Sequence, residues 1–221
     1  AHGLFDFTQK VPGAYRIRFA NATDRQGETL WGRVSREGGQ VLVLGVPATF
    51  PPEPVRGLLV AGFDAPVSTG SDARQTSDPE LYRRVAARAG PWMRPDLDEG
   101  ARAPGWHERA VGVLLRRIER KTAFALAALE ELRRGAGAPP DLVVVVFSES
   151  DTVAHHFWRD HDPASPRHDP GASALRSGAV GAVYERLDAA CAELRAAVGA
   201  DAACAVVSDH GSGGAARHIA H

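Results

Sequence analysis

The run DLVVVVFSESDTVAHH, residues 141–156, decides the fold class of this 221-residue chain. Its apolar part, residues 141–147, does not alternate with polar residues, which predicts a strand buried on both faces of a sheet. Polar residues follow at the point where that strand should end. Because ligands of open α/β sheets bind beyond the carboxyl ends of the strands, the same run also predicts where a site would lie.

Strands and long helices alternate around this run. Short apolar stretches at residues 40–46, 57–63 and 202–207 predict further strands. Apolar residues recur at intervals of three and four over residues 106–134 and 173–198, which predicts two long amphipathic helices. A strand, a long helix and a second strand form a crossover unit, and its strands must be parallel. The chain is therefore predicted to be an α/β protein.

Two shorter helices are predicted in the first half of the chain. One covers residues 29–37, and the other begins after Asp78, with Pro79 in the first helical position. No linker or internal repeat divides the sequence. We therefore expect residues 1–221 to form a single, partial domain.

Composition and charge exclude several classes of function. Twenty-six basic residues against 27 acidic ones give a net charge of −1, so no basic surplus points to nucleic acid or to an anionic membrane. The longest apolar run, residues 123–129, is far shorter than the ~20 residues of a membrane-spanning helix. Two cysteines make no disulfide framework, so free thiols and a cytoplasmic location are the default expectation.

Two predicted strands each end in a carboxylate and an imidazole. Asp151 and His155 follow the strand at residues 141–147, and Asp209 and His210 follow the later one. Parallel strands place both pairs at one edge of the sheet. Carboxylate and imidazole together suit Zn²⁺ or a similar ion better than Ca²⁺ or Mg²⁺. We therefore expect these four residues to bind metal.

Each of these residues also has a structural interpretation. Asp151 and His155 share a face if a helix starts at Asp151, whereas His156 points about 100° away. Taken alone, Asp151 is a favoured helix N-cap, His155 a hydrogen-bonded core residue, and the Asp209–His210 pair part of a turn. Their combination at two adjacent strand ends favours a metal site.

Several segments together resemble one family. They are ESDTVAHHFW at 149–158, SPR at 165–167, SDHGS at 208–212, VLGVPATFPPEP at 43–54 and HGLFDF at 2–7. These segments are similar to the type I phosphodiesterase/nucleotide pyrophosphatase branch of the alkaline phosphatase superfamily. The resemblance implies an alkaline-phosphatase-like central sheet of parallel strands flanked by helices.

The resemblance also implies a chemistry. Two divalent metal ions, usually zinc, would be bound by Asp151 with His155 and by Asp209 with His210. A Ser or Thr nucleophile would attack the phosphorus of a small phosphate ester (a phosphodiester, a nucleotide pyrophosphate or a monoester) and form a phospho-enzyme. Arg167 would contact the phosphate, unless its loop is simply a solvated surface loop.

The resemblance leaves some family residues without a counterpart. The family's first metal-binding Asp and its nucleophile precede the HGLFDF segment, and its last His ligand follows beyond residue 221. We therefore name no catalytic residue in this chain. The expectation is an internal fragment of a longer enzyme that by itself binds metal weakly and hydrolyses nothing.

Three other functions stay open. A sulfatase or phosphonate hydrolase of the same superfamily would share these ligands and differ in its nucleophile. A non-catalytic α/β domain would use the Asp and His residues in caps and turns. A one-metal hydrolase would use His156 as a base. The oligomeric state is left open.

Overall fold

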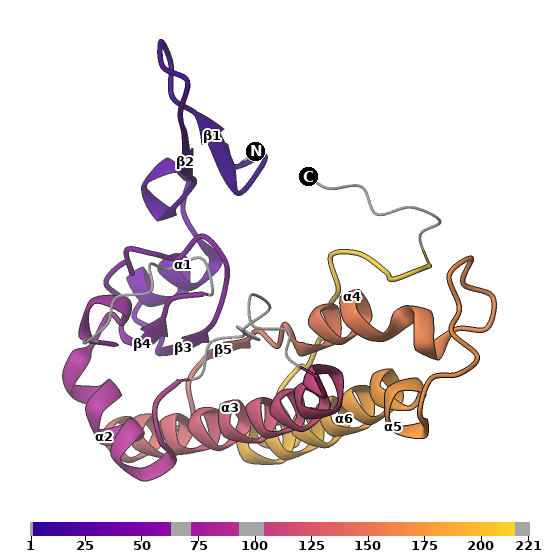
Figure 1. The fold of residues 1–221 in the computed structure, drawn as a ribbon. Coiled ribbons are helices and arrows are strands. Elements are labelled where there is room, and N and C mark those ends of the chain that lie inside the picture. Colours follow the sequence, from indigo (N-terminus) through magenta and orange to yellow (C-terminus); the bar gives the residue numbers. More distant parts are fainter. Residues whose placement is uncertain (1, 63–71, 93–103, 215–221) are drawn as a thin grey trace. The chain divides into compact units, whose positions relative to one another are not determined.

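The computed structural model describes residues 2–62, 72–92 and 104–214 (Figure 1). It shows a mixed α/β protein with a three-stranded parallel sheet and flanking helices, as expected of an alkaline-phosphatase-like chain. No helix in the described ranges combines the length and apolarity needed to cross a membrane.

The chain forms two compact units. The first contains residues 1–94 and 123–146, and the second contains residues 95–122 and 147–221. The sheet lies in the first unit and the candidate metal ligands lie in the second.

The sheet of the first unit has the strand order β4-β3-β5, with both pairs parallel. The strands are β3 (Val41–Leu44), β4 (Gly57–Val60) and β5 (Leu142–Val145). All four residues of the central strand β3 are buried, whereas those of β5 are only half-buried. The prediction that residues 141–147 are buried on both faces is therefore wrong, because β5 is an edge strand of the described sheet.

One face of the sheet packs against α1 (Leu30–Arg36). Trp31 and Val34 of this helix contact the buried cluster of Val41 and Val43 on β3. The helix begins where predicted, because the Thr29 side chain accepts a hydrogen bond from the Gly32 amide.

On the opposite side of the sheet lie α2 (Pro79–Ala89) and the last part of the long helix α3 (Trp106–Ala136) (Figure 1). Asp78 caps α2 by accepting a 2.9 Å hydrogen bond from the Leu81 amide. The ring of Phe124 packs against that of Tyr82, with 5.4 Å between centroids. Both predicted helices are confirmed, and α3 ends two residues beyond its predicted limit.

A small hairpin precedes the sheet, formed by β1 (Thr8–Lys10) and β2 (Ile17–Phe19) and followed by the 3-10 helix η1 (Ala22–Asp24). A second 3-10 helix, η2 (Asp72–Gln75), precedes α2.

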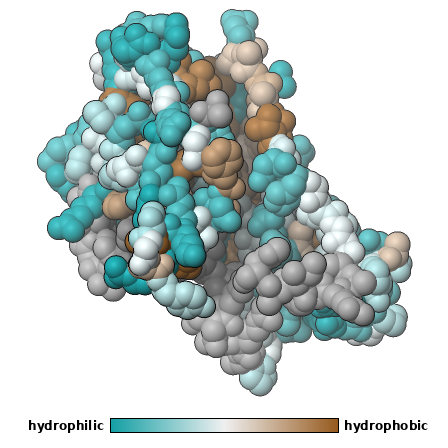
Figure 2. All heavy atoms as spheres, turned by 90° about the horizontal axis from the view of Figure 1, so that it is seen from above, coloured by the Kyte–Doolittle hydropathy of each residue, from teal (hydrophilic) through white to brown (hydrophobic). Residues whose placement is uncertain are grey.

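Figure 2 shows hydrophobic side chains at the surface among hydrophilic ones. The exposed large apolar residues of the hairpin region are Phe5, Phe7, Tyr15, Ile17 and Phe19.

The second unit is a helical bundle formed by the first part of α3 with α4 (Glu149–His161), α5 (Ala174–Ser177) and α6 (Ala179–Val198). α4 packs on α6. The hydrophobic core of the bundle, to which α3, α4 and α6 contribute, consists of Trp106, Ala110, Val111, Leu114, Ile118, Val153, Phe157, Ala179, Val180, Val183 and Ala190.

Two predictions for the second unit are wrong. The helix predicted over residues 173–198 is interrupted at Gly178, which ends α5 and precedes α6. Residues 202–207 form no strand with any strand that the structure describes, and Val206 and Val207 are 80% and 88% exposed. Alanine-rich segments have low strand propensity, and a strand is stable only when its backbone is paired. The crossover unit predicted from residues 141–147, 173–198 and 202–207 is therefore not formed in the described structure.

Candidate metal centre

Helix α4 positions Asp151 and His155. It begins at Glu149, so Asp151 lies in its first turn and Ser148 takes the N-cap position. The interpretation of Asp151 as a helix cap is therefore wrong. Residues four apart lie on one helix face, and Asp151 Oδ1 is 3.4 Å from His155 Nε2, with side chains 48% and 72% exposed.

The second pair lies in the irregular segment after residue 207. His210 Nε2 is 3.7 Å from Oδ2 of the adjacent Asp209 and 3.7 Å from Oδ1 of Asp151. The two predicted ligand pairs therefore converge on Asp151, although the strand expected to deliver the second pair is absent from the described structure.

Electrostatics at His210 favour a protonated ring when no cation is bound. Its Nδ1 is 2.9 Å from the Gly211 carbonyl oxygen. That hydrogen bond, and then the charges of Asp209 and Asp151, raise the pKa of His210 above its usual 6.5. A metal ion would compete with a proton for this ring, because only neutral imidazole is a ligand.

The distances between the donor atoms can be compared with those of a zinc site. Zinc ligands lie about 2.0–2.1 Å from the ion, so two donors on one tetrahedral ion are about 3.4 Å apart. The spacing between Asp151 and His155 meets that requirement, and the spacing to His210 is slightly wider. In the described part of the chain, no group of three or more His, Cys, Asp or Glu is arranged to hold an ion. These residues therefore supply donors in pairs. A closed zinc site normally has three or four protein ligands, and the described residues do not form such a set.

His156 has a different environment from His155, as the helical rotation predicts. Its ring packs edge-on against Trp106, with 5.0 Å between ring centroids. Trp106 is part of the core of the second unit. This contact gives His156 a packing role and does not favour its use as a base.

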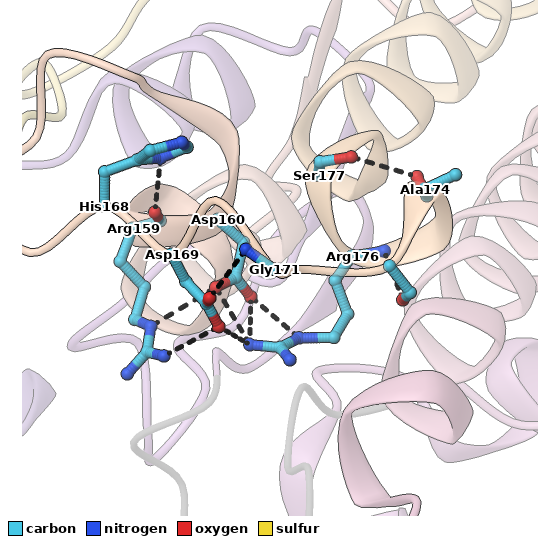
Figure 3. Close-up of polar contacts among 9 residues, drawn as sticks. Arg159, Asp160, His168, Asp169, Gly171, Ala174, Arg176 and Ser177 are labelled. Carbon is cyan, nitrogen blue, oxygen red and sulfur yellow. Dashed lines mark hydrogen bonds and ion pairs between the residues drawn. The ribbon is translucent and has the colours of Figure 1, made fainter.

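Arg167 is exposed on the loop between α4 and α5. The loop is held by buried Asp160, which accepts two 2.9 Å hydrogen bonds from the Arg176 guanidinium. Asp169 accepts a further bond from Arg159 at 3.2 Å. Figure 3 shows the two carboxylates between the two guanidinium groups. Arg167 is therefore carried by an anchored loop.

The same loop touches the segment that contains His210. Ser165 is buried, and a Cβ atom added to Gly214 would lie 2.5 Å from its Oγ. Only glycine allows so close an approach. The contact places the loop that carries Arg167 beside the residues that follow Asp209 and His210.

Sequence reasoning missed two buried ion pairs of α4. One joins Asp160 to Arg176, and the other joins Glu149 to Lys121 of α3. The first has no local sequence signal. The second had one, because Lys121 is one of only two lysines and falls on the apolar stripe predicted for residues 106–134.

The sequence model of the family described as type I phosphodiesterase / nucleotide pyrophosphatase matches residues 1–219. The chain belongs to this family. The match to this hydrolase family runs through both units and includes all four candidate ligands. Comparisons with curated proteins and with solved structures gave no significant match. Membership in this family supports an enzyme of the phosphodiesterase type.

Proposed function

We propose that this chain supplies metal ligands to a two-metal phosphohydrolase that cleaves a small phosphate ester. One observation carries the proposal: Asp151 Oδ1 faces both His155 Nε2 and His210 Nε2, at 3.4 and 3.7 Å. The two ligand pairs come from distant parts of the sequence and meet on one exposed carboxylate. If these residues served only as helix caps and turns, Asp151 would not need to lie near both imidazoles.

In this proposal, Asp151 with His155 holds one ion and Asp209 with His210 holds the other, with zinc as the expected metal. Such ions, when bound, lower the pKa of a nucleophile and neutralise phosphoryl charge. Arg167 would bind a phosphate oxygen through its guanidinium fork. The nucleophile would be a Ser or Thr, which we assign to no residue of this chain.

The substrate would be a phosphodiester, a nucleotide pyrophosphate or a phosphate monoester. Neither a nucleic acid nor a membrane surface is proposed as a partner, because the net charge of −1 provides no basic surplus for them. We also propose that the protein is located in the cytoplasm.

Hydrolysis assays on the full-length protein test this function. The substrates are the p-nitrophenyl phosphodiester, monoester and sulfate, each with and without a chelator. We expect phosphate-ester turnover that the chelator abolishes and that Asp209→Ala removes. Asp201→Ala is the matched control, because Asp201 is an exposed residue near the same segment. Turnover of the sulfate alone would favour a sulfatase, and chelator-resistant turnover would overturn the metal-dependent proposal.

A further inference from the structure

A fully buried ion pair lies at the start of α4, two residues before Asp151. Lys121 Nζ is 2.8 Å from Glu149 Oε1, and the two side chains are 3% and 0% exposed. Lys121 comes from α3, whereas Glu149 lies in the same first helical turn as Asp151. Neither residue has a role in the proposed function.

The first turn of α4 lacks the usual side-chain anchor. Ser148, in the N-cap position, makes no side-chain capping bond. The starts of α1 and α2 are each fixed by such a bond, from Thr29 and from Asp78. At α4, Glu149 of the first turn instead makes an ion pair with another helix, through Lys121 of α3.

Stability alone is a poor explanation for this pair. Removing two charges from water costs free energy that their attraction only partly returns, and a hydrophobic pair of similar volume is often at least as stable. An ion pair differs from a hydrophobic contact in being directional, because Nζ and the carboxylate oxygen must meet at hydrogen-bond distance. Such a contact fixes the rotation of the helical turn that carries it.

We propose that Lys121 and Glu149 are positioning residues for the metal centre, which hold the first turn of α4 so that Asp151 faces His155 and His210. The inference rests on the proposed function. It predicts that the pair affects zinc affinity through the placement of Asp151, separately from its effect on folding.

The test is a zinc titration of the full-length protein against a chromophoric chelator, together with the unfolding midpoint of each variant. The variants are Glu149→Gln and the neutral pair Lys121→Met/Glu149→Leu. The matched control is Asp188→Asn, which neutralises an exposed carboxylate on α6 outside the metal centre. We expect zinc affinity to fall by about tenfold or more in the first two, as for other residues that orient ligands. The control should keep the affinity of the wild type.

The neutral pair separates positioning from stability. It should fold, because it removes both charges of the pair together and leaves neither partner unpaired, and it should still bind zinc weakly. Zinc binding as tight as wild type in a folded neutral pair would overturn the inference, and so would an equal loss of affinity in Asp188→Asn. In both cases a zinc-binding wild type leaves the proposed function standing. A wild type that binds no zinc overturns both.

Discussion

Asp151 connects the two candidate ligand pairs. Its carboxylate lies in the first turn of α4, near the positive end of the helix dipole, where negative charge is favoured. Its Oδ1 faces one imidazole from its own helix and another from the segment after residue 207. Because the Asp151 side chain is half exposed, a cation can reach it from solvent.

Asp24 provides a test of the electrostatics at the level of one side chain. Its carboxylate accepts a 2.7 Å hydrogen bond from Arg18 and a 3.0 Å bond from the Asn21 amide. These contacts, the Arg18 bond first, lower the pKa of Asp24 from 3.8 to about 2. The stabilisation is therefore present above pH 3.8 and is lost as the pH falls toward 2.

We predict that an NMR pH titration finds the Asp24 pKa near 2 and that Arg18→Gln raises it toward 3.8. Arg16→Gln, which removes the same charge from a neighbouring exposed position, should change the value much less. A wild-type pKa near 3.8, or equal shifts in the two variants, would show that the Arg18 contact is not formed in solution.

At the scale of elements, the end of α4 depends on buried Asp160. We predict that Asp160→Asn lowers the free energy of unfolding by about 2–3 kcal/mol, because it weakens charge-assisted bonds at a fully buried carboxylate. Urea denaturation measures this loss. Glu37→Gln changes the same group in the exposed pair with Arg33 and should cost less than about 0.5 kcal/mol. Equal costs in the two variants would contradict the account of the loop anchor.

The contact between the α4–α5 loop and the Asp209–His210 segment can be tested with two glycines. A Cβ at Gly214 would collide with Ser165, whereas one at Gly213 meets nothing within 4 Å. We predict that Gly214→Ala speeds hydrogen exchange of the amides of Ser165 and His168, which bond within the loop. Gly213→Ala should leave their exchange unchanged. Unchanged exchange in Gly214→Ala would show that the two segments are apart in solution.

Local patterns predicted the helices well. The spacing of apolar residues predicted α3. The predicted starts of α1 and α2 agree with the helix caps at Thr29 and Asp78. The prediction that Asp151 and His155 share a helix face did not depend on where the helix starts, because residues four apart lie on one face of any helix that contains both. The error of two residues in the start of α4 therefore did not affect the pair.

Non-local contacts were not predictable in the same way. Residues 202–207 are apolar like a strand, but an apolar run does not specify a pairing partner. The burial of β5 was overestimated for the same reason, because an edge strand and a central strand can share one sequence pattern. The partners of Glu149 and Asp160 depend on packing between elements, and no local spacing identifies those partners.

At the scale of the whole molecule, the family match extends along nearly the entire chain, whereas the proposed metal site lies in one unit. The match covers residues 1–219 and identifies a phosphodiesterase-type hydrolase family. The structure adds that all four candidate ligands lie in the second unit, on α4 and the segment after residue 207. The proposed metal-dependent function therefore predicts the metal content of the protein as well as its activity.

The most direct measurement is the number of zinc ions bound to each full-length protein chain, determined for the wild type, Asp151→Asn and Asp188→Asn. A two-metal site predicts about two ions in the wild type, fewer in Asp151→Asn, and the wild-type number in Asp188→Asn, which changes an exposed helical aspartate outside the centre. A wild type without zinc, or an Asp151→Asn variant that keeps the full number, would contradict the account.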